Sequence, residues 1–258
     1  MKEWCAFHHA LGFEKIFLFD DNSDDPSLKI TATRLHMVGA IDIYDACKTG
    51  ITGTLQLDAY DMGLRMAREQ GFDWILPLDL DEFLYLPKHR TVQELINDLP
   101  DVITQVNFNW RIYGSSGHKF IEKDKLVIER FTKCSEPHFE RNLLCKSLAK
   151  VTPEQSLHLH IHGDKTNCVN GDGESSIFIG RDAVGEYADT YGQINHYCIK
   201  SVEDFLEKRT RGYPEHSWHS NMPIPNSYFE INDRNEVEGV CMKDMIERTK
   251  ETLRTWAI

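Results

Sequence analysis

Three carboxylates in this sequence directly follow a short apolar run. Asp79, Asp81 and Glu82 come after the run from Trp74 to Leu78, which has the length of a buried strand. Because ligands of open α/β sheets bind beyond the carboxyl ends of the strands, these acids are expected at a ligand-binding edge. Two aspartates separated by one residue can bind Mg²⁺ or Mn²⁺, and the cation can bind phosphate oxygens. The apolar run therefore favours a metal site at Asp79 and Asp81 over a plain acidic turn on the surface.

A second polar group follows an earlier apolar run, residues 15–19. Asp20, Asp21 and Asn22 open this group. Such side chains can hydrogen-bond the base or ribose of a nucleotide. Asp, Asn and Ser also favour turns and helix starts for purely local reasons. Taken alone, the group is better explained as a turn.

An aromatic residue beside a flexible polar loop suggests a sugar-binding surface. Trp110 precedes a Gly- and Ser-rich loop that ends at His118. Packing of Trp110 in the core at a strand end is an equal alternative. His118 has a side chain whose unperturbed pKa lies near neutrality, so it can act as a general base. A single histidine in a loop is more often only solvated.

A histidine and a lysine lie close together further along the chain. His196 is four residues before Lys200. A neutral imidazole can complete a metal site, and a lysine can neutralise the charge of a diphosphate. Without other information, His196 is better explained as a structural histidine.

Three histidines alternate with apolar residues at 157–162. His158, His160 and His162 would share one face if this segment were a strand. The pattern resembles a zinc site, but no acidic or cysteine ligand is patterned nearby. A solvated strand face is therefore the favoured interpretation.

The apolar spacing predicts the elements that carry the acids. We expect helices over residues 2–11, 26–37 and 54–70, and strands over residues 15–19, 41–44 and 74–78. Asp25 before Pro26 is a typical helix start. Helices and strands alternate here, which indicates an α/β fold with a parallel sheet.

The second half of the chain has weaker signals. Thr91 and Ser201 each begin a capping-box pattern that predicts a helix. Strands are expected over residues 103–110, 126–131 and 143–151, an irregular segment over 163–176, and a last amphipathic helix over 242–253.

Composition excludes several classes of protein. The 258 residues suit one domain of moderate size, and the formal net charge of −12 argues against nucleic-acid binding. The seven cysteines have no metal-binding spacing, so we expect free thiols in a reducing compartment. No apolar run is long enough to be a transmembrane segment or signal peptide, which predicts a soluble, cytoplasmic protein. Peripheral contact with a membrane stays open.

Five blocks of the sequence together resemble family-2-like glycosyltransferases related to family 92. They are residues 3–13, 17–25, 74–83, 107–118 and 195–212. The third block matches the W-hhh-x-D-x-DEF metal motif of that family, in which h is an apolar residue. The blocks occur in the family's order, which makes the resemblance far more specific than any single motif.

The resemblance implies a single domain, 1–258, with the GT-A fold, a nucleotide-sugar-binding α/β sheet flanked by helices. Residues 1–100 would form the nucleotide-sugar half, residues 101–212 the acceptor half and residues 213–258 a C-terminal extension. The implied activity is metal-dependent transfer of a hexose, with inversion, from a UDP-type nucleotide-diphosphate sugar. A glycan or lipid-linked acceptor, as in polysaccharide biosynthesis, would receive the sugar.

The resemblance also implies roles for individual residues. Asp79, Asp81 and His196 would hold Mn²⁺ or Mg²⁺, with Glu82 as a supporting acid near the substrate. The nucleotide would be bound by Asp20, Asp21, Asn22, Gln56 and Lys200. Trp110 and His118 would border the acceptor. His118, Glu174 and Glu203 are alternative candidates for the base.

One departure from the family concerns the beginning of the fold. The family has a strand ending in a KNE-type sequence before the first helix, and here residue 3 already lies in that helix. We therefore expect the first strand of the sheet to be missing, together with part of the nucleotide pocket.

Two alternative functions are retained. The segment from Leu78 to Glu82 superficially resembles the nucleophile motif of haloacid-dehalogenase-like phosphohydrolases. That family places the motif near the amino terminus and has Thr or Val where Phe83 stands. The chain can also be a non-catalytic, carbohydrate-binding relative.

Overall fold

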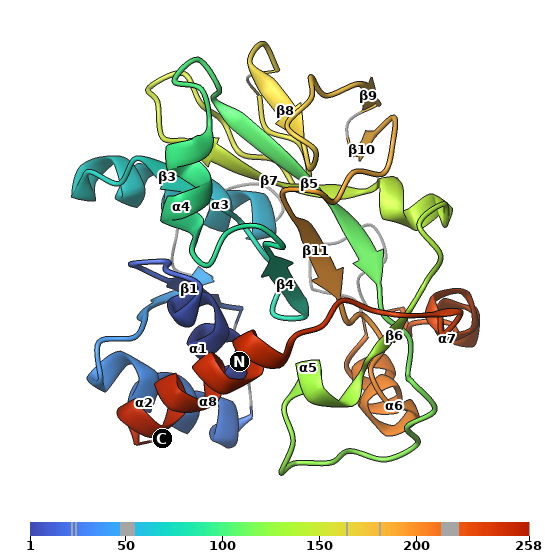
Figure 1. Cartoon of the computed structure of the whole chain (residues 1–258). Coiled ribbons are helices and arrows are strands. Elements are labelled where there is room, and N and C mark those ends of the chain that lie inside the picture. The colour runs from blue at the N-terminus through green and yellow to red at the C-terminus, as the bar shows by residue number, and fades with distance from the viewer. Residues whose placement is uncertain are drawn as a thin grey trace.

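The protein is a mixed α/β structure in which a central six-stranded sheet is flanked by helices, as the computed structural model shows (Figure 1). The structure describes residues 1–21, 23, 25–46, 55–163, 165–180, 182–212 and 222–257. Asn22 and Thr54, to which the sequence assigned a nucleotide contact and a helix cap, lie outside these residues.

The described helices are α1 (Lys2–Ala10), α2 (Pro26–Met37), α3 (Leu55–Gln70), α4 (Val92–Asp98), α5 (Val127–Arg130), the short 3-10 helix η2 (Glu140–Leu143), α6 (Val202–Arg211), α7 (Asn226–Asn232) and α8 (Lys243–Trp256). The described strands are β1 (Phe17–Asp20), β2 (Asp42–Asp45), β3 (Trp74–Ile75), β4 (Glu82–Tyr85), β5 (Gln105–Ile112), β6 (Lys133–Cys134), β7 (Cys145–Lys150), β8 (Cys168–Asn170), β9 (Phe178–Ile179), β10 (Ala183–Val184), β11 (Gln193–His196) and β12 (Val237–Glu238).

The central sheet mixes parallel and antiparallel pairs. Its strand order is β3-β7-β5-β11-β4, and β8 pairs with β5 beside this path. β5 runs parallel to β11 and β8, whereas β7 is antiparallel to both β5 and β3. β4 is antiparallel to β11. A purely parallel sheet, as the helix–strand alternation predicted, is therefore wrong for the main sheet.

The parallel pair predicted from the first helices and strands does form, but as a separate sheet. β1 and β2 pair in parallel, with Phe17 opposite Asp42. The connection between them is α2, whose N-cap Asp25 accepts a hydrogen bond from the Ser27 amide at 2.8 Å. Pro26 occupies the first helical position, as predicted.

Helix α1 covers the edge of β4 that faces away from β11. The Trp4 indole donates to the Glu82 carbonyl at 2.7 Å, and the Leu84 amide donates to His8 Nε2 at 3.5 Å. Phe7 packs edge-on against Phe83 in the main core. Side chains of α1 thus form hydrogen bonds with backbone groups of β4 that would otherwise be unpaired at the edge of the sheet.

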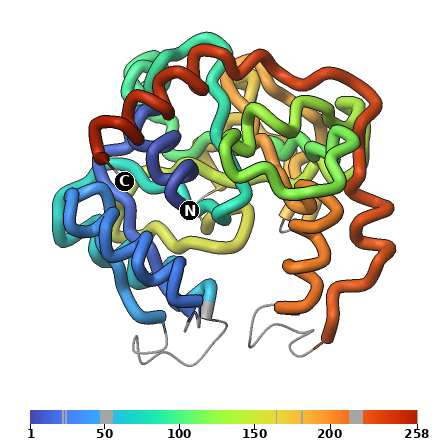
Figure 2. Tube along the Cα trace, turned by 90° about the horizontal axis from the view of Figure 1, so that it is seen from below, coloured from blue at the N-terminus to red at the C-terminus, as the bar shows by residue number. Residues whose placement is uncertain are grey.

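The C-terminal helix α8 lies beside α1, and both chain ends are close together in Figures 1 and 2. Arg248 donates to the carbonyl oxygens of Ala10 and Arg90. Met245 and Thr249 are buried on the inner face of α8. The predicted amphipathic helix therefore closes the part of the core built by the first residues.

The segment over residues 126–131 is a helix, so its prediction as a strand is wrong. The amides of Val127 and Ile128, at the start of α5, donate to the two carboxylate oxygens of Glu3 at 2.8 and 3.2 Å. A carboxylate favours a helix start because it accepts from amides that have no partner within the helix. The stabilising residue lies far away in sequence, which local periodicity does not reveal.

The histidine-rich segment 157–162 contains no strand, and its three histidines do not share a solvated face. His158 is exposed, His160 is half-buried and His162 is buried. The segment lies against β7 and bonds to it through side chains. The irregular stretch predicted for 163–176 contains one short strand, β8.

No disulfide joins the six cysteines in the described ranges, and five of them are buried. None of the helices in those ranges has the length and apolar character needed to cross a membrane.

Candidate active site

The acidic turn lies between β3 and β4, at the carboxyl end of β3 as predicted. β3 is only two residues long, so the apolar run continues as an irregular segment rather than as a strand. The Glu82 amide donates to the Asp79 carbonyl at 3.0 Å, and the Asp79 amide donates to Glu82 Oε2 at 2.9 Å. These two hydrogen bonds close the turn and fix the direction of both aspartates.

Both carboxylate oxygens of Asp79 have protein partners. Gln56, in α3, donates to Oδ1 at 2.9 Å, and Lys146, in β7, donates to Oδ2 at 3.1 Å. The Gln56 amide also donates to the Tyr60 hydroxyl at 2.9 Å. Gln56 therefore faces the acidic turn, where the sequence predicted a donor contact.

Lys146 is a buried cation between two acids. Its residue is 2% exposed, and Nζ lies 3.4 Å from Oε2 of the fully buried Glu82. Burial, opposed by Lys146 and reinforced by Asp79, raises the pKa of Glu82 well above its usual value. Burial disfavours the charged lysine, but Asp79, Glu82 and Tyr60 together outweigh burial and raise the pKa of Lys146 well above its usual value. The arrangement is therefore a charged Lys146–Asp79 pair beside a Glu82 carboxyl group whose protonated form is favoured.

Asp81 is directed toward different partners. Lys208, in α6, lies 3.1 Å from Oδ2, and His196 Nε2, in β11, lies 3.5 Å from Oδ1. Burial alone would raise the pKa of Asp81, but Lys208 and then His196 lower it well below the usual range, with a smaller contribution from Lys200. Asp81 is therefore an ionised carboxylate in a pocket of positive groups.

Helix α6 positions Lys208 through its N-terminal cap. Ser201 accepts a hydrogen bond from the Asp204 amide at 3.1 Å, and the Asp204 carboxylate accepts from the Ser201 amide at 3.2 Å. This is the predicted capping box. Lys208 also donates to the Cys198 carbonyl at 2.8 Å, which anchors its ammonium between helix and strand end.

An aromatic side chain joins the cluster through His196. The ring centroids of Trp110 and His196 are 4.3 Å apart. The ring centroids of Trp110 and His160 are 5.2 Å apart. His196 Nδ1 and Trp110 Nε1 are buried and find no hydrogen-bond partner among the residues that the structure describes. The structure thus brings Trp110, His196 and Asp81 together.

The donors present fit a divalent cation at Asp81. Among the described residues, no group of three or more His, Cys, Asp or Glu side chains is arranged to hold a metal. However, Mg²⁺ commonly takes one or two carboxylates and completes its shell with substrate phosphates and water. Asp81 Oδ1 and His196 Nε2 supply such an incomplete set, with one imidazole nitrogen still unpartnered.

The oxygens of both aspartates already have partners, which are Gln56 and Lys146 at Asp79 and His196 and Lys208 at Asp81.

Several predicted site residues lie elsewhere or make no recorded contact with this cluster. Asp20, at the end of β1, accepts from the Ser23 amide at 3.0 Å, as in the turn favoured by the sequence alone. Asp21 is exposed. His118 Nδ1 lies 3.0 Å from Glu122, and its ring packs against Phe131. Glu203 accepts from the Ile121 amide at 2.8 Å.

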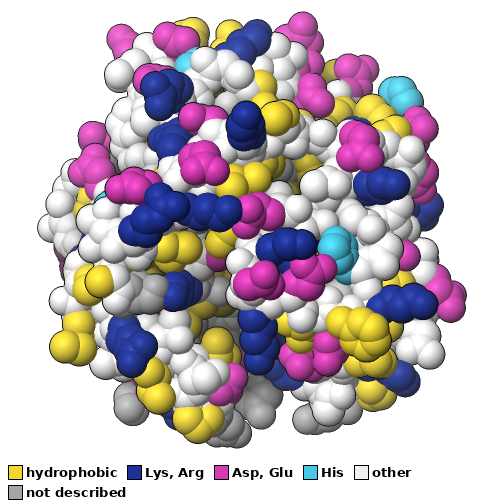
Figure 3. All heavy atoms as spheres, turned by 60° about the horizontal axis from the view of Figure 1, so that its bottom comes forward, with side chains coloured by type: hydrophobic (Ala, Val, Ile, Leu, Met, Phe, Trp, Pro, Cys, Tyr) yellow, Lys and Arg dark blue, Asp and Glu magenta, His cyan; other side chains and the backbone are white. Residues whose placement is uncertain are grey.

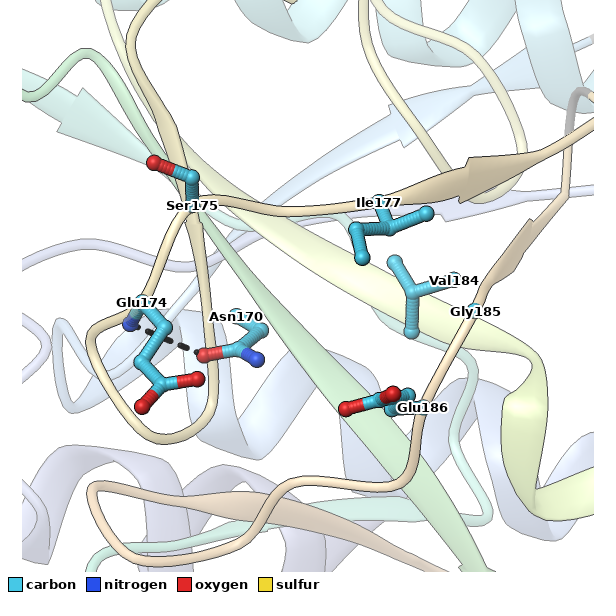
Figure 4. A pocket seen from close by; sticks show the side chains of 7 residues that line it. All are labelled: Asn170, Glu174, Ser175, Ile177, Val184, Gly185 and Glu186. Carbon is cyan, nitrogen blue, oxygen red and sulfur yellow. Dashed lines mark hydrogen bonds between the residues drawn. The ribbon is translucent and has the colours of Figure 1, made fainter.

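Glu174 lies in the loop between β8 and β9, where Figure 4 shows its amide bonded to the Asn170 side chain. A cavity of about 30 Å³ is lined there by Asn170, Glu174, Ser175, Ile177, Val184, Gly185 and Glu186. This volume holds a water molecule or two and is too small for a sugar.

Sequence reasoning missed three residues of the cluster. Lys146 is a charged residue within a predicted strand, and only the fold reveals that it is buried beside Asp79. Lys208 belongs to the last block of the family resemblance, but it received no role. His160 was assigned to a solvated strand face, which the structure corrects.

Charged side chains of both signs share the surface of the molecule. Figure 3 shows Lys and Arg side chains interspersed with Asp and Glu side chains on the face that is at the bottom of Figure 1.

Three curated proteins are similar to this chain over much of its length. A glycosyltransferase family 92 protein of Ricinus communis is 22% identical over 223 residues, which cover 81% of this chain and 34% of the relative. A second, of Oryza sativa subsp. japonica, is 20% identical and covers 81% of this chain and 32% of its own length. A third, of Arabidopsis thaliana, is 22% identical over 171 residues, or 61% of this chain and 28% of the relative.

The chain is a distant homologue of glycosyltransferase family 92 proteins. It spans about a third of the length of these curated family 92 relatives. A comparison with models of known protein families gives no match. The homology confirms the family resemblance.

Proposed function

We propose that this chain is a metal-dependent glycosyltransferase that uses a UDP-type nucleotide-diphosphate sugar. The observation that carries the proposal is the cluster at the acidic turn of a distant family 92 homologue. There, an ionised Asp81 faces His196 and Lys208, while Asp79 is held by Lys146 and Gln56. This combination suits a cation and the diphosphate that it binds.

In this proposal Asp81 and His196 hold Mn²⁺ or Mg²⁺, and Asp79 orients the turn. Such a cation, when bound, stabilises the negative charge of a departing diphosphate. Lys208 and Lys200 add positive charge beside Asp81. An acceptor hydroxyl attacks the anomeric carbon, so that the sugar is transferred with inversion and the nucleoside diphosphate leaves.

The substrate contacts are also proposals. Asp20, Asp21 and Asn22, which follow the first strand, would bind the nucleoside of the donor. Trp110 would pack against a sugar, because its ring lies beside His196 and its indole N–H has no partner in the described part of the chain. The acceptor would be a glycan or a lipid-linked sugar, and the protein would act in the cytoplasm or at a membrane surface.

The test is binding of UDP to the purified chain, measured by isothermal titration calorimetry with and without Mn²⁺. We expect binding that depends on Mn²⁺ and transfer from at least one of UDP-glucose, UDP-galactose and UDP-N-acetylglucosamine. Asp81→Asn should weaken Mn²⁺-dependent UDP binding more than about 10-fold, since even groups behind metal ligands contribute that much. Asp124→Asn, at an exposed acid, is the matched control.

Three outcomes would count against the proposal. Binding without Mn²⁺ dependence would remove the metal from it. Binding without transfer or hydrolysis of any donor would indicate a carbohydrate-binding relative. Hydrolysis of p-nitrophenyl phosphate, lost in Asp79→Asn, would instead support a phosphohydrolase, for which the comparisons give no relative.

A further inference from the structure

The segment around His160 is fastened to β7 by three hydrogen bonds. His160 Nδ1 bonds the Cys145 carbonyl at 2.9 Å, and the Ser147 hydroxyl donates to the His160 carbonyl at 2.8 Å. His162 Nε2 bonds the Ser147 carbonyl at 2.9 Å. Both the backbone and the side chain of His160 are therefore held by a central strand, although the segment is not itself regular.

These bonds define which nitrogen of His160 carries the proton. A carbonyl oxygen can only accept, so Nδ1 must be the protonated nitrogen. The lone pair of the neutral ring is then on Nε2, to which no residue in the described ranges forms a hydrogen bond. At the acidic turn, Lys146 and Asp79 hydrogen-bond each other, and the Tyr60 hydroxyl accepts from Gln56. The Nε2 lone pair of His160 is therefore an available base.

The charges around His160 favour the neutral ring. Burial lowers its pKa below 6.5, and Lys146 lowers it further, against the Cys145 carbonyl, Asp182 and Asp79, which raise it. Lys146 and Asp79 belong to the acidic cluster, so His160 is within electrostatic range of the proposed donor site.

Trp110 connects His160 with the proposed metal-binding pair. Its ring contacts His196 at 4.3 Å on one side and His160 at 5.2 Å on another. His196 in turn lies 3.5 Å from Asp81. Trp110 thus contacts both His160 and the Asp81–His196 pair, and a sugar packed against Trp110 would lie near both.

We propose that His160 is the general base of the transfer, an assignment that rests on the proposed function. His160 Nε2 takes the proton of the acceptor hydroxyl while its oxygen forms the bond to the anomeric carbon of the donor. The bond from that carbon to the diphosphate oxygen breaks, and its electron pair leaves with the diphosphate.

His118 is the other histidine considered for this step. Its Nδ1 is 3.0 Å from Glu122, and its ring contacts Phe131. Neither residue belongs to the acidic cluster.

The test compares His160→Asn with two control variants. The Asn amide can keep the hydrogen bond to the Cys145 carbonyl in place of Nδ1 but cannot accept the proton. We expect transfer to fall about 100-fold or more, the range for a lost general base. Binding of UDP with Mn²⁺ and the thermal midpoint should stay near the wild-type values. His158→Asn, two residues away and exposed, should transfer like the wild type, and His118→Asn tests the competing assignment of the base.

A pH profile and the imidazole nitrogen signals provide readouts that packing alone would not change. The wild-type rate should decline only below pH 6.5, and His160→Asn should lack this decline. Nitrogen-15 NMR should show His160 with its proton on Nδ1 at pH 7. This measurement needs no acceptor substrate.

Each result is decisive for one of the two proposals. Full transfer by His160→Asn, loss of transfer in His118→Asn alone, or a proton on Nε2 would overturn the assignment of His160. If the wild type neither binds UDP with Mn²⁺ nor transfers, the proposed function fails and the role of His160 fails with it.

Discussion

At the scale of single residues, the acidic turn depends on a cation from another strand. Lys146 is almost fully enclosed, and it neutralises Asp79 beside the buried Glu82. A buried charge that loses its partner is costly, because neither water nor another group replaces the interaction. The type and buried position of Lys146 therefore explain why two of the three acids can lie so close together.

We expect Lys146→Met to lower the free energy of unfolding by about 3 kcal/mol, the lower end for breaking a buried ion pair. Removal of the ammonium leaves Asp79 and Glu82 facing each other. Urea unfolding followed by circular dichroism measures the change.

Lys150→Met is a matched control on the same strand. Lys150 is half-buried, and its ammonium donates to the Asp101 carbonyl, so its loss should cost about 1 kcal/mol or less. Equal losses in the two variants would show that Lys146 is not the essential counter-charge.

The identity of the acidic residues was predictable, but their partners were not. Asp79, Asp81 and His196 follow from strand-end position and the family blocks. Lys146 and Lys208 reach the turn only after β7 and α6 fold against it. The separation of Lys146 from Asp79 by 67 residues leaves no local pattern to detect.

At the scale of elements, cap chemistry gave the most accurate predictions. The helices after Asp25, Thr91 and Ser201 begin where the sequence placed them. A cap is a local interaction, so a few residues determine it. At α4 the Glu94 carboxylate accepts from the Arg90 amide at 2.6 Å instead of the Thr91 amide, a small departure from the predicted box.

Elements that depend on distant partners were predicted poorly. The short helix α5 begins on the carboxylate of Glu3, and the segment of His160 is held by carbonyls of β7. Alternating apolar residues suggested strands in both places. Tertiary hydrogen bonds overrode the local preference, because they satisfy backbone groups that a strand would leave unpaired.

We expect Ser201→Ala to destabilise the protein by about 1 kcal/mol, the usual effect of a lost N-cap. The Ser201 hydroxyl is buried and accepts from the Asp204 amide, which would then have no partner at the start of α6. The midpoint of urea unfolding measures the effect.

Thr210→Ala tests the same helix away from its cap. Thr210 is exposed, and its hydroxyl bonds only the Leu206 carbonyl inside α6. Its substitution should change stability by less than about 0.5 kcal/mol. A larger loss here than at Ser201 would contradict the importance of the cap.

At the scale of the whole molecule, buried neutral histidines link stability to pH. Burial lowers the pKa of both His8 and His162 to about 3. In the unfolded chain these two histidines are protonated as the pH falls through 6.5, whereas in the folded protein they are protonated only near pH 3. Stability is thus highest above pH 6.5 and falls as the pH decreases toward 3.

The free energy of unfolding should decrease by up to about 1.4 kcal/mol per pH unit for each of these histidines below pH 6.5. His162→Gln keeps a donor for the Ser147 carbonyl but cannot titrate. This variant should reduce the slope by one proton, measured from urea unfolding at several pH values. An unchanged slope would show that His162 is protonated in the folded protein.

Helix α3 contacts two parts of the proposed active site, the acidic turn and the chain that precedes the segment of His160. Near its start, Gln56 holds Asp79, and near its end the Arg68 guanidinium donates to the carbonyls of Thr152 and Gln155 at 2.6 and 2.7 Å. These carbonyls precede the segment of His160. The two contacts are separated by about 18 Å of helix, at 1.5 Å per residue. A tilt of α3 would therefore move Asp79 and the segment that bears His160 in opposite directions. The orientation of α3 thus sets the width of the space between them.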